Sequence, residues 1–120
     1  MTAVDYVSKT DTIHIATAKQ DGSEVVTPIW GVAVDSVPYI RSGYGEGSKW
    51  YQRLQRTGQL TLVNGRSRYP AKIENVADEN VIRQVDAAYQ AKYRGQGSSL
   101  RAMVTPDARR YTMRLIPQDE

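Results

Sequence analysis

The feature that most restricts the fold of this chain is a glycine-rich junction between Val37 and Gly58. An apolar run there ends in Arg41 and Ser42, and three alternating glycines follow. Ser48 then opens a helical pattern with apolar residues on one face, and the glycine at the end is the expected stop signal. We interpret the stretch as a strand, a glycine-rich turn and a helix.

A junction of this kind gathers unpaired backbone N–H groups at the start of a helix, which suits a phosphate group. Arg41 is able to hold a phosphate with two donors, and Lys49 adds a point charge beside it. The glycine spacing differs from that of the dinucleotide fingerprint and of the P-loop. The alternative is a flexible turn that carries an exposed arginine and an exposed lysine.

The rest of the chain consists mostly of short β-type runs separated by turn signals. The predicted strands cover residues 12–18, 24–34, 37–40, 59–63, 69–76 and 109–116. Short hairpins join most of them, so the sheet is expected to be antiparallel, and a small closed or half-closed barrel would hide its edges. We therefore predict one domain over residues 1–120, mainly β (α+β), with a six-stranded antiparallel barrel.

Two inserted helices are expected, one after Ser48 and one over residues 79–93, where Asp78 is a suitable N-cap. Residues 1–11 read as a lead-in with one helical turn before Asp11. Residues 94–108 begin with glycines and serines and are expected to form a loop, which is either a mobile lid or a plain linker.

The predicted strand over residues 24–34 is apolar on both faces, so we expect it to be covered on both sides. Pro28 lies inside it and cannot donate a ladder hydrogen bond. Position 28 should therefore be a bulge or an unpaired edge, where a ligand has access to neighbouring backbone groups.

Residue usage argues against several kinds of chemistry. Cysteine is absent and His14 is the only histidine, so a zinc or iron site and a Ser-His-Asp set are both disfavoured. The net charge of +3 is spread along the chain without a basic block, which argues against nucleic acid as the partner. No apolar run is long enough for a membrane span and no signal peptide is recognisable, so we expect a cytoplasmic protein without a membrane partner. If the chain is an enzyme, a cofactor is expected to supply the reactivity.

Three short motifs carry a resemblance to a known superfamily. They are T-P-I-W on the second predicted strand, Y-I-R-S on the third, and G-S-K-W at the helix start. Together with the order of elements, they resemble the flavin-binding split-barrel superfamily, which includes pyridoxamine phosphate oxidase and its flavin- and deazaflavin-dependent relatives. Within it, the chain is most similar to small bacterial proteins of the DUF2255 type. The resemblance covers roughly residues 10–116.

The resemblance implies a homodimer with a flavin in a groove at the dimer interface. It implies cofactor contacts in three places: the ring would be lined by Thr27, Pro28, Ile29 and Trp30, the ribityl phosphate would be reached by Arg41 and Ser42, and the basic pair at the helix start would correspond to Ser48 and Lys49. The oxidases usually have Arg-Lys at that pair and basic residues on strand two. Their absence here argues against pyridoxine phosphate as the substrate.

The function expected from the resemblance is a flavin- or deazaflavin-dependent oxidoreductase that exchanges a hydride with a small organic substrate. FMN is the first expected cofactor and F420 is the alternative. A non-catalytic carrier or sensor of a flat anionic ligand on the same barrel is the alternative function. No catalytic residue is assigned from the sequence, and neither the substrate nor the direction of the reaction is predicted.

Overall fold

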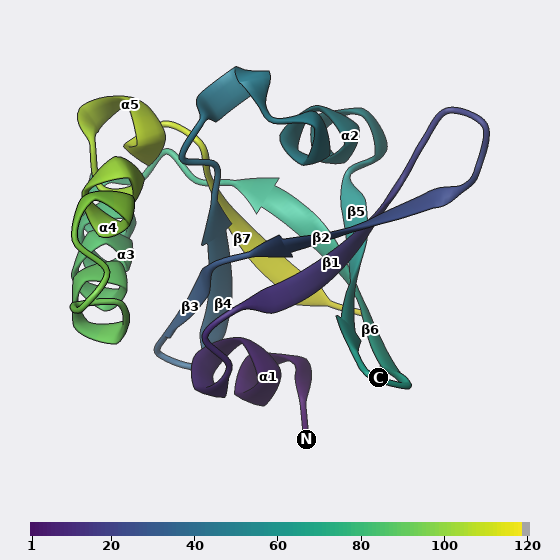
Figure 1. The fold of residues 1–120 in the computed structure, drawn as a ribbon, viewed down its shortest axis with the longest axis horizontal. Helices are drawn as coiled ribbons and strands as arrows, with labels where there is room; N and C mark the ends of the chain where they lie inside the picture. Colours follow the sequence, from purple (N-terminus) through teal and green to yellow (C-terminus); the bar gives the residue numbers. More distant parts are fainter. Residues whose placement is uncertain (119–120) are drawn as a thin grey trace.

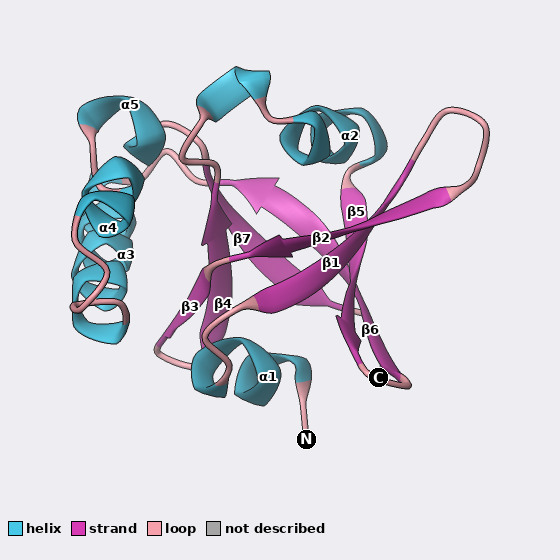
Figure 2. Ribbon diagram, in the orientation of Figure 1, coloured by secondary structure: helices cyan, strands magenta, loops and turns pink. Residues whose placement is uncertain are grey.

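The computed structural model describes residues 1–118 of the chain, and its centre is an antiparallel seven-stranded sheet in the order β2-β1-β5-β6-β7-β4-β3. The sheet curls into a half-barrel (Figures 1 and 2). The strands are β1 (Ile13–Ala18), β2 (Glu24–Ile29), β3 (Gly31–Val34), β4 (Val37–Arg41), β5 (Gln59–Asn64), β6 (Ser67–Asn75) and β7 (Thr112–Pro117). The helices are α1 (Ala3–Lys9), α2 (Lys49–Thr57), α3 (Glu79–Lys92), α4 (Ser98–Met103) and α5 (Pro106–Arg109), with a 3-10 turn at Gly45–Gly47.

The prediction of six strands is wrong by one, because the run over residues 24–34 breaks at Trp30. The break separates β2 from β3, and these two strands form the opposite edges of the sheet. Side chains of α3 and of its C-cap residue Tyr93 take up backbone groups beside the break: the Tyr89 hydroxyl donates to the Trp30 carbonyl at 3.2 Å, and the Gly31 N–H donates to the Tyr93 hydroxyl at 3.2 Å. Since a single residue separates the two edge strands, the edges of the sheet meet here and the half-barrel nearly closes.

The expectation that this run is covered on both faces is also corrected. The inward side chain of Ile29 is buried, whereas Val26 on the outer face is 50% exposed and Pro28 is exposed as well. Pro28 is compatible with the sheet because β2 is an edge strand that pairs with β1 on one side. A proline is tolerated on an edge strand, because its missing N–H can face away from the neighbouring strand.

The structure has more helices than the two that were expected. The lead-in forms α1, which begins with a capping box between Thr2 and Asp5. The expected loop over residues 94–108 contains α4 and α5, and the Thr105 side chain caps α5 by accepting from the Ala108 N–H at 3.1 Å. Both segments are too short for a periodic pattern to reveal them, which is why the sequence indicated a lead-in and a loop.

Helices α1 and α2 lie at the two ends of the half-barrel (Figure 1). The buried core between them joins Tyr6 and Val7 of α1, Leu54 of α2 and inward-facing strand residues such as Ile15 and Leu62. The predicted extent of the helix after Ser48 is confirmed closely, since Gly58 ends α2 in the left-handed conformation with φ 74°. This arrangement places the start of α2 beside the glycine-rich turn.

A second core forms where α3 packs on the outer side of β3 and β4. Val85 and Tyr89 of α3, and Tyr93 at its C-cap, lie against Val32 and Tyr39 in this cluster. The predicted cap of this helix is confirmed, because the Asp78 side chain accepts from two backbone N–H groups in its first turn. None of the helices in residues 1–118 is both long and apolar enough to cross a lipid bilayer.

Lysine 92 ties α3 to the N-terminal part of the chain. Its ammonium donates to the carbonyls of Val7 at 2.6 Å, Thr10 at 2.8 Å and Gly31 at 2.6 Å. Burial lowers the pKa of Lys92 to about 8. One side chain thereby holds α1, the chain before β1 and the start of β3 together.

Candidate functional site

A pocket of about 290 Å³ lies between the end of β2, the glycine-rich turn, the start of α2 and helix α4. We call it the Trp30 pocket. It is lined by Pro28, Ile29, Trp30, Arg41, Gly43, Tyr44, Ser48, Trp50, Ser99, Ala102 and Met103. Its walls combine aromatic and aliphatic side chains with a few hydroxyl groups, which is the composition typical of small-molecule sites.

The walls of the pocket include Trp30, the residue at the break between β2 and β3. The Trp30 indole stacks on the Tyr93 ring, with a centroid distance of 4.1 Å and an interplanar angle of 5°. The Tyr93 hydroxyl donates to the Asp11 carbonyl at 2.6 Å, and burial raises the pKa of Tyr93 to about 12. The indole is therefore supported on one face by a ring that is itself fixed by hydrogen bonds.

The glycine-rich turn lets two neighbouring segments approach closely. A Cβ atom at Gly43 would lie 2.8 Å from the Met103 sulfur, so a larger residue there would force the Met103 side chain of α4 to shift. Gly45 adopts φ +63°, and a Cβ atom there would lie 2.9 Å from the Tyr111 ring. The turn is thus shaped by contacts with α4 and with the chain before β7.

The two serines of the predicted site have different positions: Ser48 lines the pocket, and Ser42 lies within the glycine-rich turn. Ser42 is fully buried, and its hydroxyl lies 2.9 Å from the Gly45 carbonyl and 3.0 Å from the Ser48 hydroxyl. Ser48 precedes α2, and in the described part of the chain its side chain makes no capping bond to the helix. The first N–H groups of α2 are therefore left to solvent or to a ligand.

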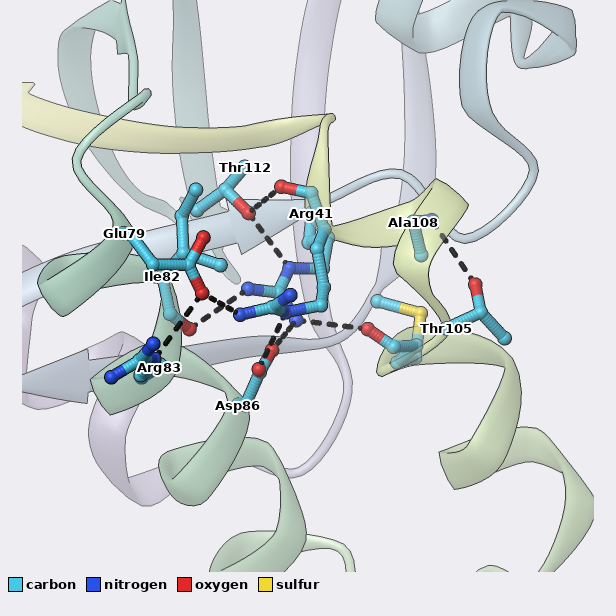
Figure 3. Close-up of polar contacts among 10 residues, drawn as sticks. Arg41, Glu79, Ile82, Arg83, Asp86, Thr105, Ala108 and Thr112 are labelled. Carbon is cyan, nitrogen blue, oxygen red and sulfur yellow. Dashed lines mark hydrogen bonds and ion pairs between the residues drawn. The ribbon is translucent and has the colours of Figure 1, made fainter.

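Arg41 does not have the free guanidinium that the sequence suggested. Its Nε donates to the Thr112 hydroxyl at 2.8 Å, and one terminal nitrogen donates to Asp86 at 2.5 Å and to the Met103 carbonyl at 3.0 Å (Figure 3). The other terminal nitrogen lies 3.4 Å from the Ile82 carbonyl, and the side chain is 0% exposed. Arg41 contributes to the pocket wall, but a phosphate would have to displace these internal partners to reach its donors.

The reason is the period of a strand, in which successive side chains point to opposite faces. Ile40 points into the barrel core, so Arg41 points to the other side, as Tyr39 does, toward α3. Asp86 of α3 also accepts from Arg109 at 2.7 Å, and Arg109 contacts Glu79 as well. This charged network, drawn in Figure 3, connects β4, α3 and α5.

Lys49 lies beside the pocket in a second, larger hollow of about 520 Å³ between α2 and the β1–β2 turn. We call this hollow the basic groove. It is lined by Lys19, Gln20, Asp21, Lys49, Gln52, Arg53 and Arg56. Lys49 is exposed and is the first residue of α2, so the positive charge predicted at the helix start is present and accessible.

The structure thus brings part of the predicted site together. Five of its members line the Trp30 pocket, namely Pro28, Ile29, Trp30, Arg41 and Ser48. Ser42 lies behind Ser48, Lys49 lies in the basic groove, and Thr27 lines neither hollow. Contacts between these residues and a cofactor stay predictions.

Sequence reasoning missed several residues of the pocket. Tyr44 lies at the rim of the pocket and is 87% exposed. A large aromatic residue between two glycines is the sequence signal that could have identified it. Trp50 lines the pocket in addition to packing on the core. Ser99, Ala102 and Met103 come from α4, a segment whose helical form and position no local pattern indicated.

Comparison with known proteins identifies a family and a fold. The profile of the family described as "Uncharacterized protein conserved in bacteria (DUF2255)" matches residues 3–115. A search of curated protein sequences gave no significant match.

Solved structures with the same fold have low sequence identity. A conserved hypothetical protein from Mycobacterium tuberculosis superposes with a TM-score of 0.72 and 16% identity, over 96% of this chain and 78% of that one. HutZ, the heme storage protein from Vibrio cholerae, gives 0.67 and 15%, over 92% and 83%. An F420-H2 dependent reductase gives 0.65 and 10%, over 88% and 93%. At these identities the comparison shows the fold, and the split-barrel resemblance predicted from the sequence is confirmed.

Proposed function

The chain belongs to the DUF2255 family and has the split-barrel fold, and on this basis we propose that it binds a flavin-type cofactor in the Trp30 pocket and acts as an oxidoreductase. One observation carries the proposal. The end of β2 and helix α4 are distant in sequence from the glycine-rich turn and the adjoining start of α2, yet together they surround one pocket whose walls suit a flat ring.

The residues present fit the ring of such a cofactor. Trp30, Trp50 and Met103 offer apolar surface, and Ser48 and Ser99 offer hydroxyl groups. The pocket lining includes no histidine, which is the axial ligand of many haem proteins, and His14 is exposed on β1. This lining favours a flavin over the haem for which HutZ is named.

The residues present also fit a phosphate at the start of α2. The first N–H groups of the helix have no side-chain cap within residues 1–118, and the Lys49 ammonium lies beside them. Helix N-termini of this kind bind anions through backbone N–H groups and the helix dipole. In this proposal Lys49 and the helix start bind the phosphate, Ser48 reaches it by its hydroxyl, and Ser42 positions Ser48.

When bound, a flavin or deazaflavin ring supplies hydride transfer to or from a small organic substrate. The chain supplies binding and orientation. Trp30 is held by Tyr93 and forms a rigid wall, and α4 covers the side next to Gly43 and keeps water from it. Tyr44, exposed at the rim, is placed to contact the outer face of the ring.

We further propose that the site is completed by a second copy of the chain. A volume of about 290 Å³ is at the lower end of the range for cofactor sites, roughly 300–1,000 Å³. The adjoining edge strand β2 exposes Val26 and Pro28 on its outer face, and such apolar edges are usually covered. Analytical ultracentrifugation should show a dimer, and a monomer that binds flavin would contradict this part of the proposal.

The test of the cofactor begins with an absorption spectrum of freshly purified protein. Titrations with FMN and with F420 come next, and the fluorescence emission of Trp30 and Trp50 is the signal that reports binding. We expect saturable quenching with at least one cofactor. Lys49→Gln should weaken that binding by about tenfold, because it removes the charge nearest the phosphate. Lys72→Gln on β6 removes the same charge outside the site and should leave binding unchanged.

The outcomes separate the candidate functions. Binding together with turnover of a reduced cofactor supports the oxidoreductase, and binding without turnover by any electron donor or acceptor supports the carrier or sensor of a flat anionic ligand. Absence of binding by both cofactors at millimolar concentration would reject the flavin proposal.

A further inference from the structure

The basic groove continues the cofactor site, and we propose that the cofactor carries an extended polyanionic tail that lies in this groove instead of ending at a single phosphate. The inference rests on the proposed function and narrows it to one class of cofactor. The observation behind it is the arrangement of charged side chains along α2 and the β1–β2 turn. These two segments are neighbours in Figure 1.

The cations of the groove form a row and do not cluster around one point. Lys49, Arg53 and Arg56 lie at intervals of four and three residues, so they share one face of α2, and Lys19 faces them from the β1–β2 turn. Lys49 and Arg56 are seven positions apart on the helix, which corresponds to about 10 Å along its axis. A single phosphate is too small to contact both ends of this row, whereas a linear ligand with several negative groups spans it.

The groove has a strong excess of positive charge. Lys19, Lys49, Arg53 and Arg56 face one carboxylate, that of Asp21. This carboxylate already accepts from the Ser23 N–H at 2.9 Å and from the Ser23 hydroxyl at 2.6 Å, and these bonds lower its pKa. Within residues 1–118, none of the four cations forms an ion pair. Their charge is therefore available to a ligand.

The two arginines are oriented before any ligand arrives. Arg53 donates from Nε to the Thr17 hydroxyl at 2.6 Å, and Arg56 donates from one terminal nitrogen to the Ala18 carbonyl. Each bond engages one of the nitrogens and leaves further N–H groups of the guanidinium for an anion. Because the side chains are already held by β1, less conformational entropy is lost when a ligand binds.

The groove and the Trp30 pocket meet at the start of α2. Ser48 and Trp50 line the pocket, and Lys49 between them lines the groove. A molecule with its ring in the pocket and its phosphate at the helix start would have its next anionic groups beside Arg53 and Arg56. The two hollows thus fit two parts of one molecule.

This geometry discriminates between the two candidate cofactors by their chemistry. FMN ends at its phosphate and would leave the far half of the groove without a partner. A deazaflavin of the F420 type continues beyond its phosphate into a chain of glutamates, whose carboxylates match a row of arginine and lysine side chains. The basic groove therefore favours the long-tailed deazaflavin.

The test uses a variant with Lys19→Gln and Arg56→Gln, which changes the groove but neither the pocket nor Lys49. We expect its affinity for F420 to fall about tenfold or more at low salt, since two charged contacts are lost, while its affinity for FMN changes less than about twofold. Arg66→Gln with Lys72→Gln removes the same charge from β6 and its preceding turn and should leave both affinities unchanged. Tetraglutamate should compete with F420 for the wild-type protein and much less for the groove variant.

The results separate this inference from the proposed function. If F420 and FMN bind equally and the groove variant affects neither, the tail inference is overturned while the cofactor proposal stands. If neither cofactor binds to the wild-type protein, the proposed function fails and the inference fails with it. A fall in F420 affinity that the charge-matched control reproduces would also overturn the inference, because net charge and not the groove would then be the cause.

Discussion

The buried guanidinium of Arg41 on β4 forms an ion pair of 2.5 Å with the carboxylate of Asp86 on α3. The arginine side chain is 0% exposed, and its remaining donors bind Thr112 of β7 and the carbonyls of Ile82 and Met103. Through this one side chain the sheet holds both α3 and the last residue of α4, which forms a wall of the Trp30 pocket. The residue that the sequence offered as a phosphate ligand is an internal anchor for the pocket.

Replacing this anchor should destabilise the protein. Arg41→Met leaves buried acceptors without a donor, and we expect the free energy of unfolding to fall by about 3–5 kcal/mol, the range for breaking a buried charged pair. Urea denaturation measures the change. Arg83→Met removes an exposed arginine that pairs with Glu79, and should cost less than about 0.5 kcal/mol. If Arg41→Met kept full stability and lost only cofactor binding, Arg41 would be a ligand and not an anchor.

The glycine-rich turn contains a matched pair of positions with opposite expectations. Gly45→Ala forces a left-handed residue and places a Cβ atom 2.9 Å from the Tyr111 ring, so we expect a loss of about 1–3 kcal/mol in the free energy of unfolding. Gly47 has no such φ, and a Cβ atom there meets nothing within 4 Å. Gly47→Ala should therefore be neutral within about 0.5 kcal/mol. Thermal melting of both variants provides the comparison, and equal melting temperatures would refute this account of the turn.

Tyr44 provides a test of the pocket that does not disturb the fold. Its ring is 87% exposed, so Tyr44→Ala should change the free energy of unfolding by less than about 0.5 kcal/mol. If the ring contacts the bound cofactor, the dissociation constant should rise about 2- to 12-fold, the equivalent of 0.5–1.5 kcal/mol for one aromatic contact. Tyr44→Phe keeps the ring and should bind as the wild type does. Unchanged binding of Tyr44→Ala would exclude Tyr44 from the site.

The wall behind Trp30 should weaken at high pH. Burial raises the pKa of Tyr93 to about 12 from a usual value near 10, so the unfolded chain loses this proton first as the pH rises. Stability from Tyr93 is thus fully present below pH 10 and is lost between pH 10 and 12. Relative to Tyr93→Phe, which cannot ionise at this position, the free energy of unfolding of the wild type should fall by about 1 kcal/mol between pH 10 and 11. Urea denaturation of both proteins at several pH values in this interval measures the difference between their free energies of unfolding. A difference that stays constant with pH would contradict the prediction.

The sequence by itself determined the local elements whose signals are short-range. The hairpin over Asn64 and Gly65, the helix capped by Asp78 and the stop at Gly58 depend on the conformational preferences of a few neighbouring residues. The strand, glycine-rich turn and helix around the candidate site were readable for the same reason. The family resemblance added the choice of a split barrel, which is confirmed by the comparisons.

Only the tertiary structure decided which groups face one another across the fold. The break at Trp30 depends on the hydroxyl groups of Tyr89 in α3 and of Tyr93 at its C-cap, which lie about sixty residues away in the chain. The direction of Arg41 was open in the sequence, because alternation defines two faces of a strand but not which face meets Asp86. The pairing of α2 with the β1–β2 turn, which forms the basic groove, likewise arises when the sheet curls. Local preferences select conformations of the chain, whereas burial and hydrogen bonding between distant segments select which side chains remain free to bind a ligand.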